Sequence, residues 1–268
     1  MRITSLQNQR IKDVVKLQQR KHRDKQAKMI IEGYRAILYA LENGYPMEAL
    51  YCCPSLYFGK NEPNLITHVQ STGTQLVEVS EPVFLKMALR ARPEGLLAVA
   101  PQIRQPLHMH TPPQNALYIM AESIEKPANL GSILRTADGA GAHAVVVCNA
   151  CTDIFNPNVV RASVGTFFSV PTLDSSSQQA LDWCRRHNIC VVAATPAATM
   201  SYTDVDMRRP VAIAVGTEQV GLSALWLEQA DFAVKLPMLG QVNSLNVSVA
   251  TSILLYEAVR QRSQPSDC

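Results

Sequence analysis

Three loops that each follow or precede an apolar segment carry the polar residues able to do chemistry. Residues 216–222 (GTEQVGL) follow the run PVAIAV and place the carboxylate of Glu218 between two glycines that permit a tight turn. Residues 236–246 (LPMLGQVNSLN) open the last helical segment. The third loop begins a helix with Asn129, which could cap it, and carries Arg135 six residues later. Together they offer a carboxylate, amides, a hydroxyl and a guanidinium.

Each loop also has an ordinary structural interpretation. Glu218 could be an acidic residue favoured near a helix start by the helix dipole. Ser244 or Asn243 could serve only as an N-cap. Asn246 at an otherwise apolar helix start, and Arg135 on a helix otherwise suited to packing, are unusual as purely structural residues. The loops therefore indicate a functional site, although none decides its chemistry alone.

Several nucleotide-binding and hydrolase motifs are absent from the sequence. A nicotinamide dehydrogenase would need G-x-G-x-x-G directly after a strand. Gly139-x-Gly141 stands instead at a predicted helix end, where C-capping explains it. There is also no phosphate-binding P-loop and no G-x-S-x-G nucleophile turn.

The elements that must position these loops fall into two α/β sets. Strand patterns alternate with helix patterns up to about residue 100, which predicts a small α/β domain over 1–100. Residues 101–114 contain four prolines and no periodic pattern, so we expect a linker in which His108 and His110 are exposed. A second set over 115–268 has near-continuous Val, Ile and Ala strands. It predicts a parallel sheet covered by helices on both faces, with ligands bound beyond the carboxyl ends of its strands.

Positive charge is concentrated at the start of a chain whose formal net charge is only +3. Residues 1–28 hold nine basic and two acidic side chains, and an apolar stripe predicts a helix over roughly 4–28. Such a segment suits RNA phosphates. A solvated helix with spare lysines explains the charge equally well.

Length and composition bound the class of protein. The chain has 268 residues and is 47% hydrophobic, which is enough for one large or two modest cores. No apolar run reaches the ~18–20 residues that cross a bilayer, and the polar start does not resemble a secretory signal. Seven cysteines, an odd number, predict reduced thiols in a cytoplasmic protein. Cys148-x-x-Cys151 has no second ligand pair at zinc spacing, so we predict no metal.

Taken together, the segments NLGSILRTADGAGA, VGTEQVGLS and LPMLGQVNSLNVSVATSILLYEA resemble the three motifs of the SpoU (TrmH) branch of SPOUT RNA 2′-O-methyltransferases. The resemblance spans 115–262. IIEGYRAILYALENG and EGLLAVA resemble, more weakly, the small ribosomal-protein-like RNA-binding domain that precedes it in many members. The resemblance implies an α/β SPOUT domain with a deep C-terminal trefoil knot. It also implies a homodimer with the active site near the subunit interface.

The resemblance also implies S-adenosylmethionine as cofactor and assigns roles by motif position. Arg135 is the proposed catalytic residue of the family. A guanidinium has a pKa above ~12, so we interpret it as a cation that holds a substrate phosphate and stabilises the developing alkoxide. The implied active-site set is Arg135, Asn129, Glu218, Ser244 and Asn246. The implied cofactor contacts are Thr195, Gly216, Leu236, Met238, Gly240 and Leu245.

The expected substrate is structured RNA, with rRNA preferred to tRNA and no DNA or membrane partner. Candidate phosphate contacts are Arg10, Lys12, Arg20, Lys21 and Arg23 in the basic segment, and Arg161 in a later helix. A tRNA ribose methyltransferase is one alternative. The other is a non-catalytic RNA-binding assembly factor on the same fold. Gln219-Val220 replace the charged or small residues usual after the motif-two glutamate, which affects fine loop contacts.

Overall fold

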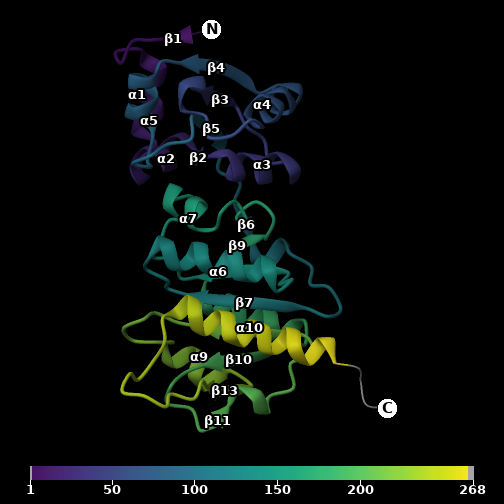
Figure 1. Ribbon diagram of the computed structural model, residues 1–268. Helices are drawn as coiled ribbons and strands as arrows, with labels where there is room; N and C mark the ends of the chain where they lie inside the picture. The colour runs from purple at the N-terminus through teal and green to yellow at the C-terminus, as the bar shows by residue number, and fades with distance from the viewer. Residues whose placement is uncertain (1, 265–268) are drawn as a thin grey trace. The chain divides into compact units, whose positions relative to one another are not determined.

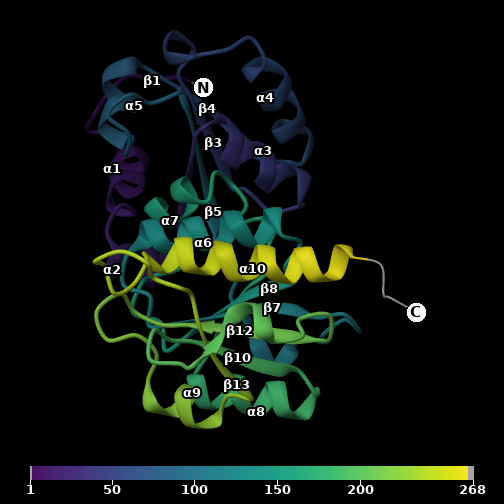
Figure 2. The same cartoon turned by 60° about the horizontal axis from the view of Figure 1, so that its bottom comes forward.

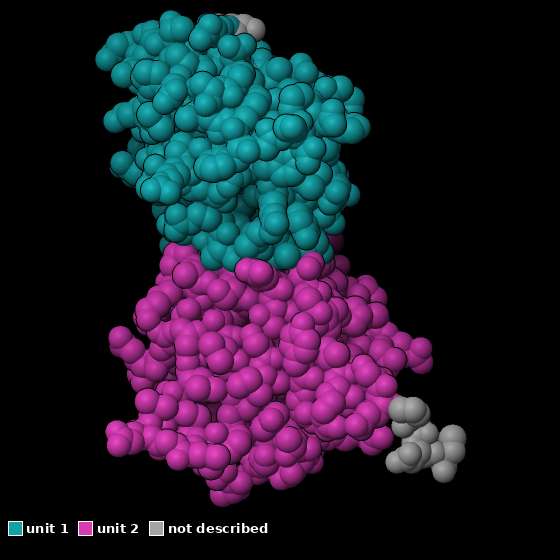
Figure 3. Space-filling model, viewed as in Figure 1, with its two compact units in different colours: residues 1–103, 155–169 teal, residues 104–154, 170–268 magenta. Residues whose placement is uncertain are grey.

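A computed structural model describes residues 2–264 and divides the chain into two compact units (Figure 3). Unit 1 comprises the residues up to 103 together with 155–169. Unit 2 comprises 104–154 and the residues from 170 onward. The sequence predicts 1–100 and 115–268 as domains, and it gives no sign that 155–169 returns to the first unit. That return occurs because helix α7 (Pro157–Ala162) packs against strand β2 (Lys28–Glu32).

Unit 1 is built on a mixed five-stranded sheet in the order β1-β4-β3-β5-β2 (Figure 1). Strand β4 pairs in parallel with β1 and β3, whereas β5 pairs antiparallel with β3 and β2. The remaining strands are β1 (Arg2–Ile3), β3 (Ala49–Cys52), β4 (Gln75–Val79) and β5 (Leu96–Pro101), and the helices are α1 (Gln9–Lys16), α2 (Arg20–Gln26), α3 (Tyr34–Glu42), α4 (Glu62–Ser71) and α5 (Glu81–Met87).

The basic segment forms two short helices rather than the single predicted helix over 4–28. Asn8 caps α1, and the chain turns at Leu17 before α2 begins. Arg23 is only 2% exposed, and its guanidinium donates to the carbonyls of Leu17 (2.9 Å) and Gln18 (2.8 Å). The predicted role of Arg23 as a phosphate contact is therefore wrong. Its guanidinium donates the hydrogen bonds that these carbonyls lack where α1 ends.

Unit 2 contains an eight-stranded sheet in the order β11-β13-β10-β12-β7-β8-β9-β6, and every neighbouring pair is parallel. Helices α6 (Pro127–Gly139) and α10 (Val247–Ser263) lie side by side over one face, while α8 (Ser177–Arg186) and α9 (Ala224–Gln229) pack together on the other (Figures 1 and 2). The predicted parallel sheet covered on both faces is confirmed, whereas the knot stays a prediction. The strands are β6 (Gln105–Pro106), β7 (Leu117–Glu122), β8 (Ala144–Cys148), β9 (Thr172–Ser175), β10 (Cys190–Ala194), β11 (Met200–Ser201), β12 (Val211–Val215) and β13 (Phe232–Lys235).

Residues 101–114 are more ordered than a linker. Strand β6 pairs with β9, and a short 3-10 helix covers Leu107–Met109. His108 is exposed as expected, but His110 is half-buried with Nε2 3.0 Å from the hydroxyl of Tyr118. This contact holds the segment on unit 2.

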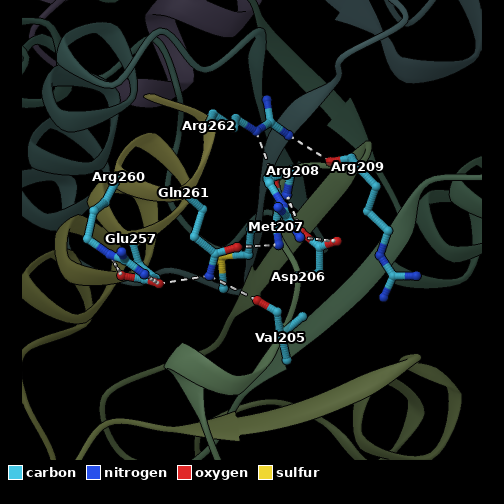
Figure 4. Close-up of polar contacts among 9 residues, drawn as sticks. All are labelled: Val205, Asp206, Met207, Arg208, Arg209, Glu257, Arg260, Gln261 and Arg262. Carbon is cyan, nitrogen blue, oxygen red and sulfur yellow. Dashed lines mark hydrogen bonds and ion pairs between the residues drawn. The ribbon is translucent and has the colours of Figure 1, made fainter. Parts of the chain in front are cut away.

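The C-terminal half of α10 is held by a guanidinium that donates only to main-chain carbonyls. Arg262 donates to the carbonyl oxygens of Asn115 (2.9 Å), Ala116 (2.9 Å), Met207 (2.9 Å) and Arg209 (2.8 Å). Figure 4 shows its bonds to Met207 and Arg209, beside the contacts of the neighbouring Gln261. These bonds fix α10 against the segments that lead into β7 and β12. No helix among residues 2–264 combines the length and apolar content that crossing a bilayer requires.

Candidate active site

A cavity of about 330 Å³ lies at the carboxyl ends of three adjacent strands of unit 2. Strands β13, β10 and β12 are neighbours, and the residues after each of them line the cavity together with the first turns of α10. Its volume falls within the ~300–1,000 Å³ of typical small-ligand sites. Of the predicted cofactor contacts, Thr195, Gly216, Leu236, Met238 and Leu245 line the wall. Gly240 is exposed and does not line it.

The turn after β12 requires glycine at its first position. A Cβ on Gly216 would lie 2.2 Å from the carbonyl carbon and oxygen of Gly221 and 2.4 Å from the nitrogen of Leu222. Thr217 and Gly221 exchange two main-chain hydrogen bonds of 3.1 Å, which close the turn. Gly221 has φ of +72°, a conformation that favours glycine. This turn presents bare main chain to the cavity.

Side chains from three distant segments meet at Glu218. Asn129 Nδ2 donates to Glu218 Oε1 at 2.7 Å, and Asn246 Nδ2 donates to the same oxygen at 2.5 Å. Asn246 Nδ2 also lies 3.2 Å from Asn129 Oδ1. Lys126 pairs with the second carboxylate oxygen. The hydrogen bond from Lys126, followed by that from Asn129, lowers the pKa of Glu218, so the carboxylate is ionised at neutral pH.

Asn246 is the residue that caps α10. Its Oδ1 accepts from the Ser248 nitrogen at 3.0 Å and from the Ser248 hydroxyl at 2.7 Å. The suggestion that Ser244 or Asn243 caps this helix is therefore wrong, because α10 begins at Val247. Ser244 is exposed and lines the cavity.

One predicted residue, Arg135, has no bond to the Glu218 cluster, and one member of the cluster, Lys126, was missed. Arg135 is exposed on α6 and makes no hydrogen bond or ion pair with any residue between 2 and 264. Lys126 was not predicted, although it stands just before Pro127, the first residue of α6. The sequence feature that could have indicated Lys126 is a basic residue one helical turn before Asn129.

The predicted phosphate contacts other than Arg23 are exposed. Arg10 and Lys12 lie on α1, Arg20 and Lys21 lie on α2, and Arg161 lies on α7. Arg20 pairs with Asp24 at 3.4 Å, a surface pair that leaves its charge accessible.

Within residues 2–264, no three His, Cys, Asp or Glu side chains gather as a metal site would require. Cys148 is fully buried and Cys151 is exposed. Burial raises the pKa of the Cys148 thiol, which therefore stays protonated at neutral pH.

Comparison with known proteins places this site in a family. The sequence profile described as the SpoU rRNA Methylase family matches residues 116–256, and that of the MRM3-like substrate binding domain matches 8–98. The chain belongs to the SpoU rRNA methylase family. Both matches agree with the two resemblances in the motifs.

Relatives and solved structures cover nearly the whole chain. A 23S rRNA (guanosine(2553)-2′-O)-methyltransferase of Bacillus subtilis is 29% identical over 95% of this chain and 97% of its own length. A crystal structure of an RNA 2′-O ribose methyltransferase is 45% identical, with a TM-score of 0.87 over 98% of this chain and 99% of that one. An AdoMet-bound rRNA methyltransferase from Sinorhizobium meliloti is 31% identical, with a TM-score of 0.89 over 97% of both chains. The similarity to these methyltransferases therefore extends over unit 1 as well as unit 2.

Proposed function

We propose that this SpoU family member transfers a methyl group from S-adenosylmethionine to a ribose 2′-hydroxyl of RNA, with rRNA as the preferred substrate. One observation carries the proposal: the strand-end cavity of unit 2 adjoins a carboxylate that Asn129 and Asn246 hold from two other segments. Side chains held together from such distant positions are what a binding or catalytic site requires. The relatives named above methylate rRNA or RNA ribose.

The cavity wall suits S-adenosylmethionine. Gly216 lines the cavity with main chain alone, because a side chain there would collide with the main chain of Gly221 in the same turn. Leu236, Met238 and Leu245 supply apolar surface, and Thr195 adds a hydroxyl. When bound, the cofactor supplies an electrophilic methyl group on a sulfonium.

The protein then has to position a ribose hydroxyl. Direct transfer needs the oxygen aligned behind the methyl at ~3 Å, which is chiefly a matter of orientation. Glu218, Ser244 and Asn246 orient the turn and the cofactor. Arg135 holds a substrate phosphate and stabilises the negative charge that develops on the oxygen, while the phosphate can relay the proton.

We also propose that the working form is a homodimer in the cytoplasm. Arg135 has no partner within the described part of its own chain, so a second copy could complete its surroundings. Exposed apolar side chains on α10 and in the loop before it support this: Val249 and Tyr256 on α10 are 47% and 53% exposed, and Leu239 in the loop is 98% exposed. Light scattering of the purified protein tests the dimer, and a monomer at micromolar concentration would contradict it.

Arg135→Ala tests the catalytic proposal. With labelled S-adenosylmethionine and RNA from cells that lack this chain, we expect methyl transfer to fall at least ~100-fold, as for loss of a single stabilising donor. Cofactor affinity measured by calorimetry should change little. Arg186→Ala, on α8, is the control and should transfer normally. Full turnover by Arg135→Ala would remove the proposed role, and failure of the unaltered protein to bind the cofactor would refute the proposed function.

A further inference from the structure

Unit 1 contains a second cavity of about 490 Å³ that the methyl-transfer site does not use. Its wall comes from the first turn of α3, the loop before α4, the loop after α5, and α7. All four segments belong to unit 1. The volume is sufficient for one nucleotide, since small-ligand sites span ~300–1,000 Å³.

One end of this cavity is suited to a phosphate. Tyr34, Arg35 and Ala36 form the first turn of α3, where main-chain N–H groups have no partner within the helix. No acidic residue lies within that first turn, but Glu94 from the loop after α5 accepts from the Tyr34 nitrogen, so the nitrogens of Arg35 and Ala36 are the ones left for a ligand. The side chains of Arg35 and Arg161 are exposed on the wall and make no hydrogen bond or ion pair within residues 2–264. Two exposed guanidiniums beside a helix N-terminus favour an anion, and the charge of Arg161 also acts on the carboxylate of Glu32.

The other lining groups are suited to a base. Phe58 is 75% exposed, so the face of its ring is open for a base to stack on. Glu62 is only 3% exposed, and while its Oε1 accepts from the Gly59 nitrogen at 2.8 Å, its Oε2 is buried without a hydrogen bond among the described residues. Bases carry N–H donors that such an acceptor can bind.

The loop after α5 is held rigidly enough to define the wall. Arg90 pairs with Glu94, and Glu94 Oε2 accepts from the Tyr34 nitrogen at 3.0 Å. The buried carboxylate of Glu32 accepts from the nitrogen of Leu89 at 2.9 Å. Arg90 Nε remains buried without a partner among residues 2–264, a second unused polar group on the same wall.

We infer that this cavity of unit 1 binds one unpaired nucleotide of the RNA substrate, with the base stacked on Phe58 and facing Glu62 and the phosphate near Arg35 and Arg161. The inference rests on the proposed function, because it takes RNA as the substrate. Unpaired bases stacked on aromatic rings are the usual means by which proteins read RNA sequence. The cavity would therefore select RNA with a bulged or looped-out nucleotide over a continuous duplex.

Three RNA probes built on one labelled stem test this with the full-length protein. One carries a single bulged guanosine, the second an abasic bulge, and the third is fully paired. Fluorescence anisotropy should show the guanosine bulge bound about tenfold more tightly than the abasic bulge, and Phe58→Ala should abolish that preference. Phe58→Trp should restore it, with quenching of the new indole on binding. Leu85→Ala, at another exposed apolar residue of unit 1, should leave the preference unchanged.

Two further variants separate the base from the phosphate. Glu62→Gln should reduce the preference for guanosine over the abasic bulge, whereas Arg161→Ala should weaken both bulged probes alike. Equal binding of the guanosine and abasic bulges by the unaltered protein, or a preference that survives Phe58→Ala, would overturn the inference. Methyl transfer to total RNA is measured alongside. Transfer without the preference refutes only this inference, while the preference without transfer refutes only the proposed function.

Discussion

Glu218 in unit 2 and Glu62 in unit 1 each line a cavity, and they differ in what their carboxylates contact. Glu218 is bonded by Lys126, Asn129 and Asn246, which come from two other parts of the same unit. One oxygen of Glu62 accepts only from the nearby nitrogen of Gly59, and the other has no donor within residues 2–264.

The difference separates a site completed by folding from one completed by its ligand. The donors around Glu218 are fixed once α6, β12 and α10 pack, so that cavity is ready before any ligand arrives. A buried acceptor left unpaired costs about 1–3 kcal/mol, and a ligand that supplies the donor removes that cost. Changes in unit 2 should therefore act through the fold of the site, and changes at the unit 1 cavity through ligand contact.

Gly216→Ala should have the largest effect. The new Cβ would overlap the main chain of Gly221 at 2.2 Å, so the turn must open and the cavity wall must move. Overpacking costs about 1–3 kcal/mol or more, and we expect affinity for S-adenosylmethionine to fall about 100-fold in calorimetry. Gly141→Ala is the control, because Gly141 has open space around its Cβ and a positive φ of +64°, so an added Cβ strains the local main chain without meeting any neighbour. It should lower stability and leave cofactor affinity unchanged. Normal cofactor binding by Gly216→Ala would show that the turn is not the wall.

Arg262→Met should have the next largest effect, which is a loss of stability. The change removes the donor to four main-chain carbonyls, of which that of Ala116 keeps its bond from the Val211 nitrogen. Figure 4 shows the bonds to Met207 and Arg209. We expect the free energy of unfolding to fall by about 3 kcal/mol. The two tryptophans of the chain, Trp183 and Trp226, both lie in unit 2, so their fluorescence in urea reports on that unit.

Arg185→Met, on α8 of the same unit, provides the comparison for Arg262. Arg185 and its partner Asp182 are 3.6 Å apart with side chains 54% and 50% exposed, so the loss of this pair should cost less than about 1 kcal/mol. Equal destabilisation by the two variants would mean that the main-chain bonds of Arg262 do not anchor α10.

Arg262 also marks the limit of what the sequence could predict. Strand and helix periodicity, together with the glycines of residues 216–222, located the sheet and its strand-end loops. The contacts of Arg262 with residue 115 and of Glu218 with Lys126 join positions 147 and 92 residues apart, and no local pattern encodes such pairs. The same holds for the return of 155–169 to unit 1.

Local patterns failed where a side chain had two possible uses. Arg23 lies in a basic run and was expected to face solvent, yet the break between α1 and α2 created carbonyls that needed a donor. Ser244 and Asn243 were suitable caps by type, but α10 begins three residues later and uses Asn246. Both outcomes depend on where a helix begins or ends, which periodicity fixes only to within a few residues.

Lys126→Met should produce a smaller, pH-dependent effect. Lys126 lowers the pKa of Glu218 below its ordinary value of 4.5, so the stabilisation is present above that value and is lost as pH falls through the lowered pKa. The melting temperature of the variant should therefore lie below that of the unaltered protein at pH 7, and the gap should close at acidic pH. Lys235→Met, at an exposed residue of the same unit, should show no such convergence. A gap that is constant from pH 7 to pH 3 would contradict the pairing of Lys126 with Glu218.

Lys21→Ala should have the smallest effect. It extends the comparison of the two cavities to an exposed surface that has no cavity. Lys21 is exposed on α2, so it can neutralise a phosphate but cannot distinguish a base. Affinity for the guanosine-bulge, abasic and paired probes should fall by the same factor, about twofold to threefold. The slope of log affinity against log salt should become shallower by about 0.7–0.9. Arg23→Met, two residues away but buried, should lower stability and leave the slope unchanged. If Lys21→Ala instead weakened only the guanosine-bulge probe, Lys21 would take part in recognising the base. Contacts that form only when the ligand binds would then extend beyond the cavity that Phe58 lines.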